Sequence, residues 1–368
     1  MRISFIFLLA FAVLNVAAQN QPYFTTKYDF VPGDKLMVVE DFTRVNIGDF
    51  PAGWNTNATA EVVTVKDQNG KWLKITKTGV FHPEMIQEVP DNMTLEFHLI
   101  AGNREHPKPF AVNILSLADY SDFKFFDAQS LAPRGKRHGV QLKLWPGHRV
   151  NNKAATEVLA GKTIRYDVQN KVNFLTWHNV TNSRAHVAMW RQGTRLRVYV
   201  NGEKVWDLPK AFDAGTKYNA ITFAMPAGIK GDEYYLLGHI RMAVGAPDTR
   251  AKWQQQGKFA TNGILFDSGS DRIKPESYGV LKEISTILHE DPNSKVKITG
   301  HTDSDGDDNN NLVLSKKRAA AVKDALVNFF GISADKFQTD GKGEKEPGEK
   351  GDTPKAKAAN RRVVFEKL

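Results

Sequence analysis

The strongest constraint on the fold is a change of hydrophobic period near residue 250. From about Tyr23 to Val244, short runs that alternate apolar and polar residues are separated by Gly, Asn, Asp and Pro, which is the pattern of β-strands. Beyond residue 258, strand-like runs alternate with segments whose apolar residues recur at helical spacing. A chain of 368 residues also exceeds the usual size of one domain. We therefore predict two domains of different class.

The first residues have the form of an export signal. Arg2 precedes an apolar run from Ile3 to Val16, and small residues follow up to Ala18. The run is shorter than a helix that spans a bilayer. We expect residues 1–18 to be a signal peptide that is cleaved after Ala18.

Composition narrows the classes of function. The sequence has no cysteine, which excludes disulfides, thiolate metal sites, cysteine nucleophiles and a lipid anchor on cysteine. The formal net charge of +9 falls to +8 when Arg2 is removed with the signal, and such a surface suits anionic envelope polymers or solvent alone. We expect no cofactor and no nucleic-acid partner.

Two segments of the first half give the clearest strands. In residues 94–100 one face would carry Leu95, Phe97 and Leu99, and the other Thr94, Glu96 and His98. In residues 195–200 the inward side chains would be Leu196, Val198 and Val200. Asn201-Gly202 then favours a type I′ turn, with a return strand through residues 204–206.

The first half resembles the laminin-G or concanavalin-like superfamily. The resemblance rests on Phe42, Gly53-Trp54 and residues 72–75, 195–202 and 236–244. It implies an all-β sandwich of jelly-roll or laminin-G type over residues 22–248. The competing interpretation is an outer-membrane β-barrel in which residues 234–244 face lipid. Most strands are shorter than the 9 to 11 residues of a tilted crossing, so the sandwich is favoured.

The second half would begin after a polar linker at residues 249–258. We predict strands at residues 264–266, 295–300 and 362–365, and a solvated loop within residues 341–357. A helix near Pro275 would bury Leu281, Ile284, Ile287 and Leu288. Another, capped by Ser315, would bury Ala319, Val322, Leu326 and Phe329. These elements form an α/β sandwich.

Four segments identify the family of this second domain. They are residues 264–267 with 273–276, 298–303, 311–319 and 360–363. In this order and spacing they resemble the OmpA-like peptidoglycan-binding domain, over residues 259–368. The resemblance implies an α/β fold and binding of the peptidoglycan stem peptide.

Asp303 and Arg318 are the first candidates for the binding site. Asp303 is expected to end a strand, and Arg318 to lie one turn into the next helix, so that carboxylate and guanidinium face one pocket. A ligand suited to this pair carries both an ammonium and a carboxylate, as diaminopimelate does in the stem peptide. Arg318 would bind the carboxylate through paired hydrogen bonds, and Asp303 the ammonium. The resemblance assigns the same roles, while a plain salt bridge is the structural alternative.

Further residues are expected around this pair. Asn311 would bond the ligand or pin the loop, Leu314 would wall the pocket, and Ser315 would cap the helix. The resemblance adds polar contacts from Thr302, Asn360, Arg361 or Arg362. The acidic loop at residues 303–310 lacks the Gly and Glu that an EF-hand requires at its sixth and twelfth positions, so we predict a solvated loop without metal.

The sequence contains no pattern that indicates catalysis. Metalloprotease, nucleophile-elbow and paired-carboxylate glycosidase motifs do not occur. The tryptophans at 54, 145, 177, 190 and 206 are interpreted mainly as core residues rather than a sugar-stacking platform.

Two hypotheses follow for the whole chain. In the first, a non-enzymatic envelope protein binds peptidoglycan and tethers the outer membrane, or a β-sandwich binding module, to the cell wall. In the second, the same anchor presents a lectin-like sandwich that captures a glycan or protein in the periplasm or at the surface. Both place the protein in the periplasm or outer membrane, and they differ only in the first half.

Overall fold

The structure of the chain is a computed structural model. It describes residues 28–102, 108–117, 126–127, 132–133, 137–145, 153–161, 163–165, 184–225, 233–245 and 249–368. The predicted signal peptide, residues 1–18, lies outside them, as do His106, His148, His178 and Trp177.

The described strands of the N-terminal domain form two large antiparallel sheets and one two-stranded sheet. The first large sheet has the order β15-β14-β13-β6-β17-β4-β3, with β1 also paired to β17. Its strands are β1 (Lys35–Glu40), β3 (Ala60–Val65), β4 (Gln68–Ile75), β6 (Asn92–Gly102), β13 (Arg184–Gln192), β14 (Arg195–Val200), β15 (Glu203–Leu208) and β17 (Tyr234–Val244).

The second large sheet has the order β12-β11-β10-β7-β16-β5-β2. Its strands are β2 (Trp54–Thr56), β5 (Gly79–Pro83), β7 (Phe110–Ser116), β10 (Arg137–Trp145), β11 (Lys153–Gly161), β12 (Thr163–Arg165) and β16 (Ala220–Met225). Strands β8 (Phe126–Asp127) and β9 (Ala132–Pro133) pair with each other.

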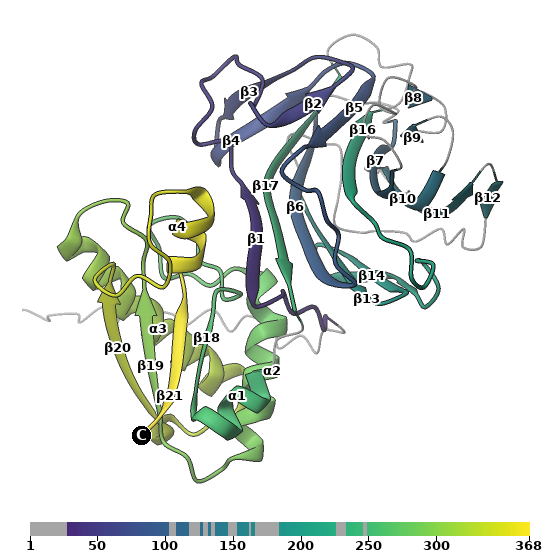
Figure 1. Cartoon of the computed structure of the whole chain (residues 1–368). Coiled ribbons are helices and arrows are strands. Elements are labelled where there is room, and N and C mark those ends of the chain that lie inside the picture. Colours follow the sequence, from purple (N-terminus) through teal and green to yellow (C-terminus); the bar gives the residue numbers. More distant parts are fainter. Residues whose placement is uncertain are drawn as a thin grey trace, which may run out of the picture.

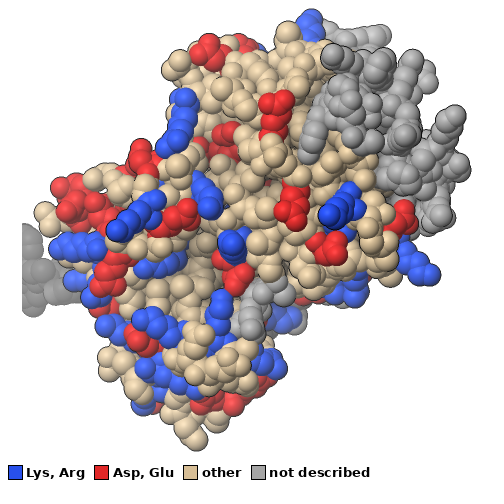
Figure 2. All heavy atoms as spheres, viewed as in Figure 1, with Lys and Arg blue, Asp and Glu red and all other residues tan. Residues whose placement is uncertain are grey.

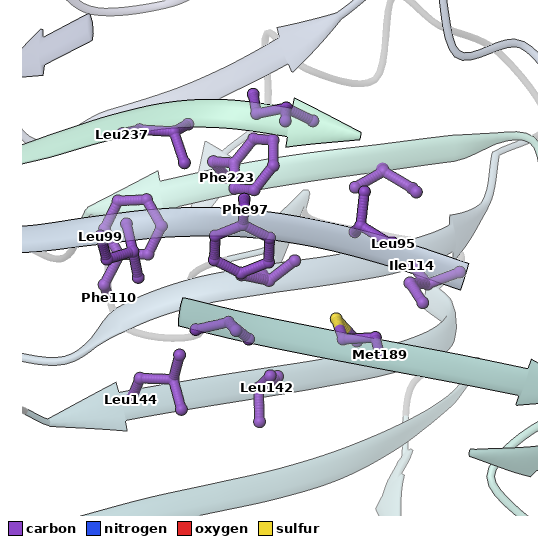
Figure 3. Packing of buried hydrophobic residues seen from close by; sticks show 14 of the residues in the cluster. Leu95, Phe97, Leu99, Phe110, Ile114, Leu142, Leu144, Met189, Phe223 and Leu237 are labelled. Carbon is purple, nitrogen blue, oxygen red and sulfur yellow. The ribbon is translucent and has the colours of Figure 1, made fainter. Parts of the chain in front are cut away.

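One apolar core joins the two large sheets. Leu95, Phe97 and Leu99 on β6 are fully buried in it, as the alternation predicts. Phe97 meets Phe223 of β16, in the other sheet, with ring centroids 5.4 Å apart in an edge-to-face arrangement. Figure 3 shows both rings among the aliphatic side chains of this cluster. The N-terminal domain is therefore mostly β, with sheets stacked across a common core.

The opposite face of β6 carries the polar residues that the alternation predicts. Thr94, Glu96 and His98 do point away from the core, but they are only 1%, 6% and 8% exposed. The C-terminal domain covers this face, since Nε2 of His98 lies 3.9 Å from a carboxylate oxygen of Glu276. The alternation predicted the direction of each side chain, but it did not indicate that a second domain packs on the polar face.

The predicted hairpin is present between β14 and β15. Asn201 and Gly202 both have positive φ, 49° and 81°, as a type I′ turn requires. Leu196, Val198 and Val200 are fully buried. This local prediction is confirmed.

The C-terminal domain has a four-stranded sheet in the order β18-β21-β19-β20. Strands β19 and β20 are parallel, and the other pairs are antiparallel. The strands are β18 (Lys258–Thr261), β19 (Val296–His301), β20 (Phe337–Gly343) and β21 (Val363–Lys367). The helices are α1 (Thr249–Gln256), α2 (Tyr278–Glu290), α3 (Asp308–Phe330) and α4 (Pro354–Asn360), with short 3₁₀ turns η2 (Pro275–Ser277) and η3 (Ala334–Lys336). Figure 1 shows this domain beside β1 and β17 of the first.

Several boundaries in this domain differ from the sequence expectations. The segment predicted as a linker, residues 249–258, contains helix α1, whose Trp253 packs in the C-terminal core. Residues 264–266 form no strand, and Phe266 makes only an isolated bridge to Ile273. The predicted loop at 341–357 includes the end of β20 and the start of α4.

The helix that was expected to start near Ser315 starts seven residues earlier. Asp307 caps α3, with its carboxylate accepting from the backbone N–H groups of Asn309 and Asn310. An aspartate suits this position because its carboxylate accepts hydrogen bonds from the free N–H groups of the first turn, and its negative charge is stabilised at the N-terminus of a helix. On α3, Ala319, Val322 and Leu326 are buried as predicted. Phe329 is 40% exposed, so that part of the prediction was wrong.

Candidate functional site

A cavity of about 1070 Å³ lies between the two domains. Its C-terminal wall comes from the loop 262–274, residues 300–307, the first turns of α3 and residues 358–363. Among the described residues that line it are Thr302, Asp303, Asn311, Leu314, Arg318 and Arg361. Of the predicted site residues, Ser315 and Asn360 are not in its lining.

Asp303 lies two residues beyond the end of β19, as expected from its position after a strand. It is 9% exposed. Its Oδ1 accepts a hydrogen bond from the backbone N–H of Asp305 at 3.2 Å, and its Oδ2 forms a salt bridge with Arg361. The loop and Arg361 therefore fix the orientation of this carboxylate toward the cavity.

Arg318 lies ten residues beyond the first residue of α3, not one turn into the helix as predicted. Its Nε donates to the carbonyl of Ser270 at 2.9 Å, and its guanidinium lies 4.9 Å from the ring centroid of Phe266. Burial lowers the pKa of Arg318, and the negative charge of Asp303 opposes that shift. The two charges share one cavity and interact, although the salt bridge of Asp303 is made with Arg361.

Asn311 pins the loop before α3. Its Nδ2 donates to the carbonyl of Asp305 at 3.0 Å and to the carboxylate of Glu344 at 2.6 Å. It is 6% exposed. Of the two roles expected for this residue, the observed contacts are those of a loop anchor at the edge of the cavity.

Ser315 has a structural role different from the predicted cap. It is fully buried inside α3, where its Oγ donates to the carbonyl of Leu312 and accepts from the N–H of Gly343. It therefore ties α3 to the end of β20. Thr302 lines the cavity, is 3% exposed, and its Oγ1 has no hydrogen-bond partner among the described residues.

The remaining predicted residues divide between the cavity and its support. Leu314 is half-buried and lines the cavity. Asn360 accepts from the N–H groups of Gly348 and Glu349, so it holds a loop outside the cavity lining. Arg361 and Arg362 both line the cavity. Arg361 pairs with Asp303, and Arg362 donates to the carbonyl of Glu346.

The second wall of the cavity belongs to the β domain and was not predicted. Its polar lining residues on strands β6, β13 and β17 are Glu96, His98, His186, His239 and Arg241. Burial lowers the pKa of His98 and that of His239, the latter to about 4. A run of polar residues on one face of the strand at 94–100 was the available signal, but it did not show what covers that face.

The described tryptophans considered for a sugar-stacking platform lie in the core or pack against neighbouring side chains. Trp54 and Trp206 are buried in the core, while half-buried Trp190 stacks with Arg197 at 5.0 Å. The Trp145 side chain lies outside the described residues. Within the described ranges, groups of His, Asp and Glu placed to hold a metal ion do not occur. The same ranges contain no helix that is long and apolar enough to cross a membrane.

Charge is mixed on the outer surface. Figure 2 shows Lys and Arg interspersed with Asp and Glu over the C-terminal domain, and fewer charges over the upper part of the β domain. The face in view has no continuous basic stripe, so the net positive charge does not mark a binding surface there.

The C-terminal domain thus is an α/β domain with an aspartate after a strand and an arginine on the next helix at one cavity. Residues 265–361 match the OmpA family. The chain carries an OmpA family domain at its C-terminus.

Known proteins resemble this part of the chain. Outer membrane porin F of Pseudomonas aeruginosa is 36% identical over 103 residues, which cover 28% of this chain and 29% of that protein. The peptidoglycan-binding protein ArfA of Mycobacterium tuberculosis is 35% identical over 100 residues, covering 27% and 30%. The chain therefore spans less than a third of either relative.

A solved structure is similar to about the same share of this chain. The peptidoglycan-associated lipoprotein from Burkholderia pseudomallei is 28% identical, with 30% of this chain and 89% of that chain covered and a TM-score of 0.27.

Proposed function

We propose that the chain is an exported, non-catalytic envelope protein that binds peptidoglycan through its C-terminal domain. The observation that carries the proposal is the placement of Asp303 and Arg318 on one cavity of an OmpA family domain. A similar segment occurs in a protein named for peptidoglycan binding.

The ligand that fits this pair is the zwitterionic end of diaminopimelate in the stem peptide. Arg318, oriented by the carbonyl of Ser270 and by Phe266, binds the carboxylate through paired hydrogen bonds. Asp303 binds the ammonium, and Arg361 holds that carboxylate in its orientation. Thr302 adds a hydroxyl, and Asn311 holds the loop.

We further propose the identity of the remaining parts. Residues 22–248 form a sandwich of jelly-roll or laminin-G type, supported by two antiparallel sheets on one core. Residues 259–368 form the wall-binding domain. The signal-like residues 1–18 support export to the periplasm or outer membrane, where the wall-binding domain tethers the β-sandwich module, or the membrane itself, to the wall.

Sedimentation with purified sacculi tests the site. We expect the unchanged chain to pellet with sacculi that contain diaminopimelate, and Arg318→Ala or Asp303→Ala to lower the bound fraction by about tenfold or more, since each loses a charge-assisted hydrogen bond. Arg250→Ala and Asp335→Ala, which alter exposed salt bridges outside the cavity lining, serve as matched controls. Equal pelleting by folded site and control variants would reject the assignment.

A further inference from the structure

The wall of the cavity formed by the β domain is built from buried polar groups. His98 lies next to both His186 and His239, with ring centroids 5.2 Å apart in each pair. Oε2 of Glu96 lies 3.2 Å from Nε2 of His186, and the guanidinium of Arg241 donates to the backbone and side-chain oxygens of Asn262. These five groups of the β domain line the same cavity as Asp303 and Arg318.

Several atoms on this wall lack partners. Within the described part of the chain, Glu96 Oε1, His98 Nδ1 and Arg241 Nε are buried and make no hydrogen bond. On the C-terminal wall, Thr302 Oγ1 and His301 Nδ1 are also buried and make no hydrogen bond to described residues. Buried polar groups are almost always bonded to protein, water or ligand, so a polar occupant between the walls would satisfy donors and acceptors on both sides.

The charges on this wall are fixed. Burial opposes ionisation of Glu96, but the hydrogen bond from His186 and the charge of Arg241 outweigh it and lower its pKa. Arg241 in turn feels the charge of Arg361, the partner of Asp303. With the imidazoles of His98 and His239 neutral at pH 7, the wall offers one anion, one cation and neutral rings that can donate or accept.

The cavity is also larger than one amino acid requires. Its volume of about 1070 Å³ reaches the upper range of pockets for drug-sized ligands. The zwitterionic end of diaminopimelate would occupy only the part beside Asp303 and Arg318, which leaves room for the chain attached to it.

We propose that the β domain supplies a second subsite of this cavity, which binds the amide-linked stem peptide that continues from diaminopimelate. The inference rests on the proposed function. Peptide groups carry a donor and an acceptor each, which match Glu96 Oε1 as acceptor and Arg241 Nε as donor. His98 serves either role, and His239 walls the subsite.

Calorimetric titration of the full chain with three ligands tests the subsite: free diaminopimelate, a stem tetrapeptide that contains it, and the corresponding disaccharide tetrapeptide. We expect the tetrapeptide to bind about tenfold or more tighter than free diaminopimelate, as two added hydrogen bonds would give. Arg241→Gln should abolish most of this gain because it removes the donor, and His239→Asn should reduce the gain because it removes part of the wall. Both should leave the affinity for free diaminopimelate unchanged. Asn tolerates the positive φ of 54° at position 239.

Controls separate the outcomes. Arg195→Gln and His289→Asn make the same chemical changes outside the cavity lining and should keep the full gain, with far-UV spectra used to verify folding. If variants of the β wall keep the gain, the subsite is overturned and that part of the cavity holds water only. A gain that appears only with the disaccharide would also overturn the subsite. If Arg241→Gln misfolds, His239→Asn and His98→Gln decide the result. Failure of free diaminopimelate to bind would instead reject the proposed function.

Discussion

The two faces of strand β6 are both buried, but for different reasons. Leu95, Phe97 and Leu99 pack against the second sheet in a continuous apolar core. Glu96 and His98 lie under the C-terminal domain, where each keeps one polar atom without a partner among the described residues. The first face stabilises the fold by removing apolar surface from water. The second face lines a cavity, and we expect it to contribute less to stability than the first because part of its buried polar surface has no hydrogen-bond partner.

The largest effect should come from the apolar face. Phe97→Ala removes a fully buried ring that meets Phe223 of the other sheet, and we expect a loss of about 3–5 kcal/mol in the free energy of unfolding, because the transfer and cavity costs add. Chemical denaturation measures it, with Val313→Ala, at an exposed position, as control. A loss below about 1 kcal/mol would mean that the sheets do not share this core.

An intermediate effect should come from acidification. The pKa of His239 is lowered by burial and by the positive charge of Lys274 to about 4, below the value of about 6.5 in an unfolded chain. Between these values the unfolded state binds more protons, so the free energy of unfolding falls as pH drops from about 6.5 to about 4. His98 acts in the same direction.

The contribution of one imidazole can be isolated by difference. Burial raises the pKa of Glu283 to about 7, and this shift acts in the opposite direction in every variant. Denaturation of the unchanged chain and of His239→Asn at pH 7 and pH 4.5 should show an acid loss that is smaller in the variant by on the order of 2 kcal/mol. Identical losses in the two proteins would contradict the account of His239 as a buried neutral group.

The smallest effect should come from the polar face of β6. His98→Leu replaces a ring that has a buried nitrogen without a partner by an apolar side chain of similar size. We therefore expect a change of less than about 1 kcal/mol in the free energy of unfolding. The measurement is the same denaturation at pH 7. A loss as large as that of Phe97→Ala would show that the two faces of β6 stabilise the fold alike.

This contrast also explains what could be predicted from the sequence. Alternation at residues 94–100 gave the direction of each side chain, and the Asn201-Gly202 turn was fixed by local conformation. Neither contains information on distant packing, so the domain that covers Glu96 and His98 could not be foreseen. Period and turn chemistry are local, whereas burial of a polar face depends on contacts between segments far apart in the chain.

The candidate site shows the same limit. Asp303 and Arg318 were predicted from the motif, and both line the cavity. The start of α3 was misplaced because Asp307 and Ser315 are both good caps, and only the fold selects Asp307. The salt bridge from Asp303 to Arg361 joins residues 58 positions apart, which spacing alone does not reveal.

The central claim is that Arg318 recognises the free carboxylate of diaminopimelate. The most direct measurement compares pelleting of the full chain with two kinds of purified sacculi, stripped of attached polymers, that contain either diaminopimelate or lysine at the same position of the stem peptide. Lysine keeps the ammonium and lacks the carboxylate. The account predicts at least about tenfold weaker retention on the lysine type, and no such difference for Arg318→Ala. Equal retention of the unchanged chain on both sacculi would contradict it.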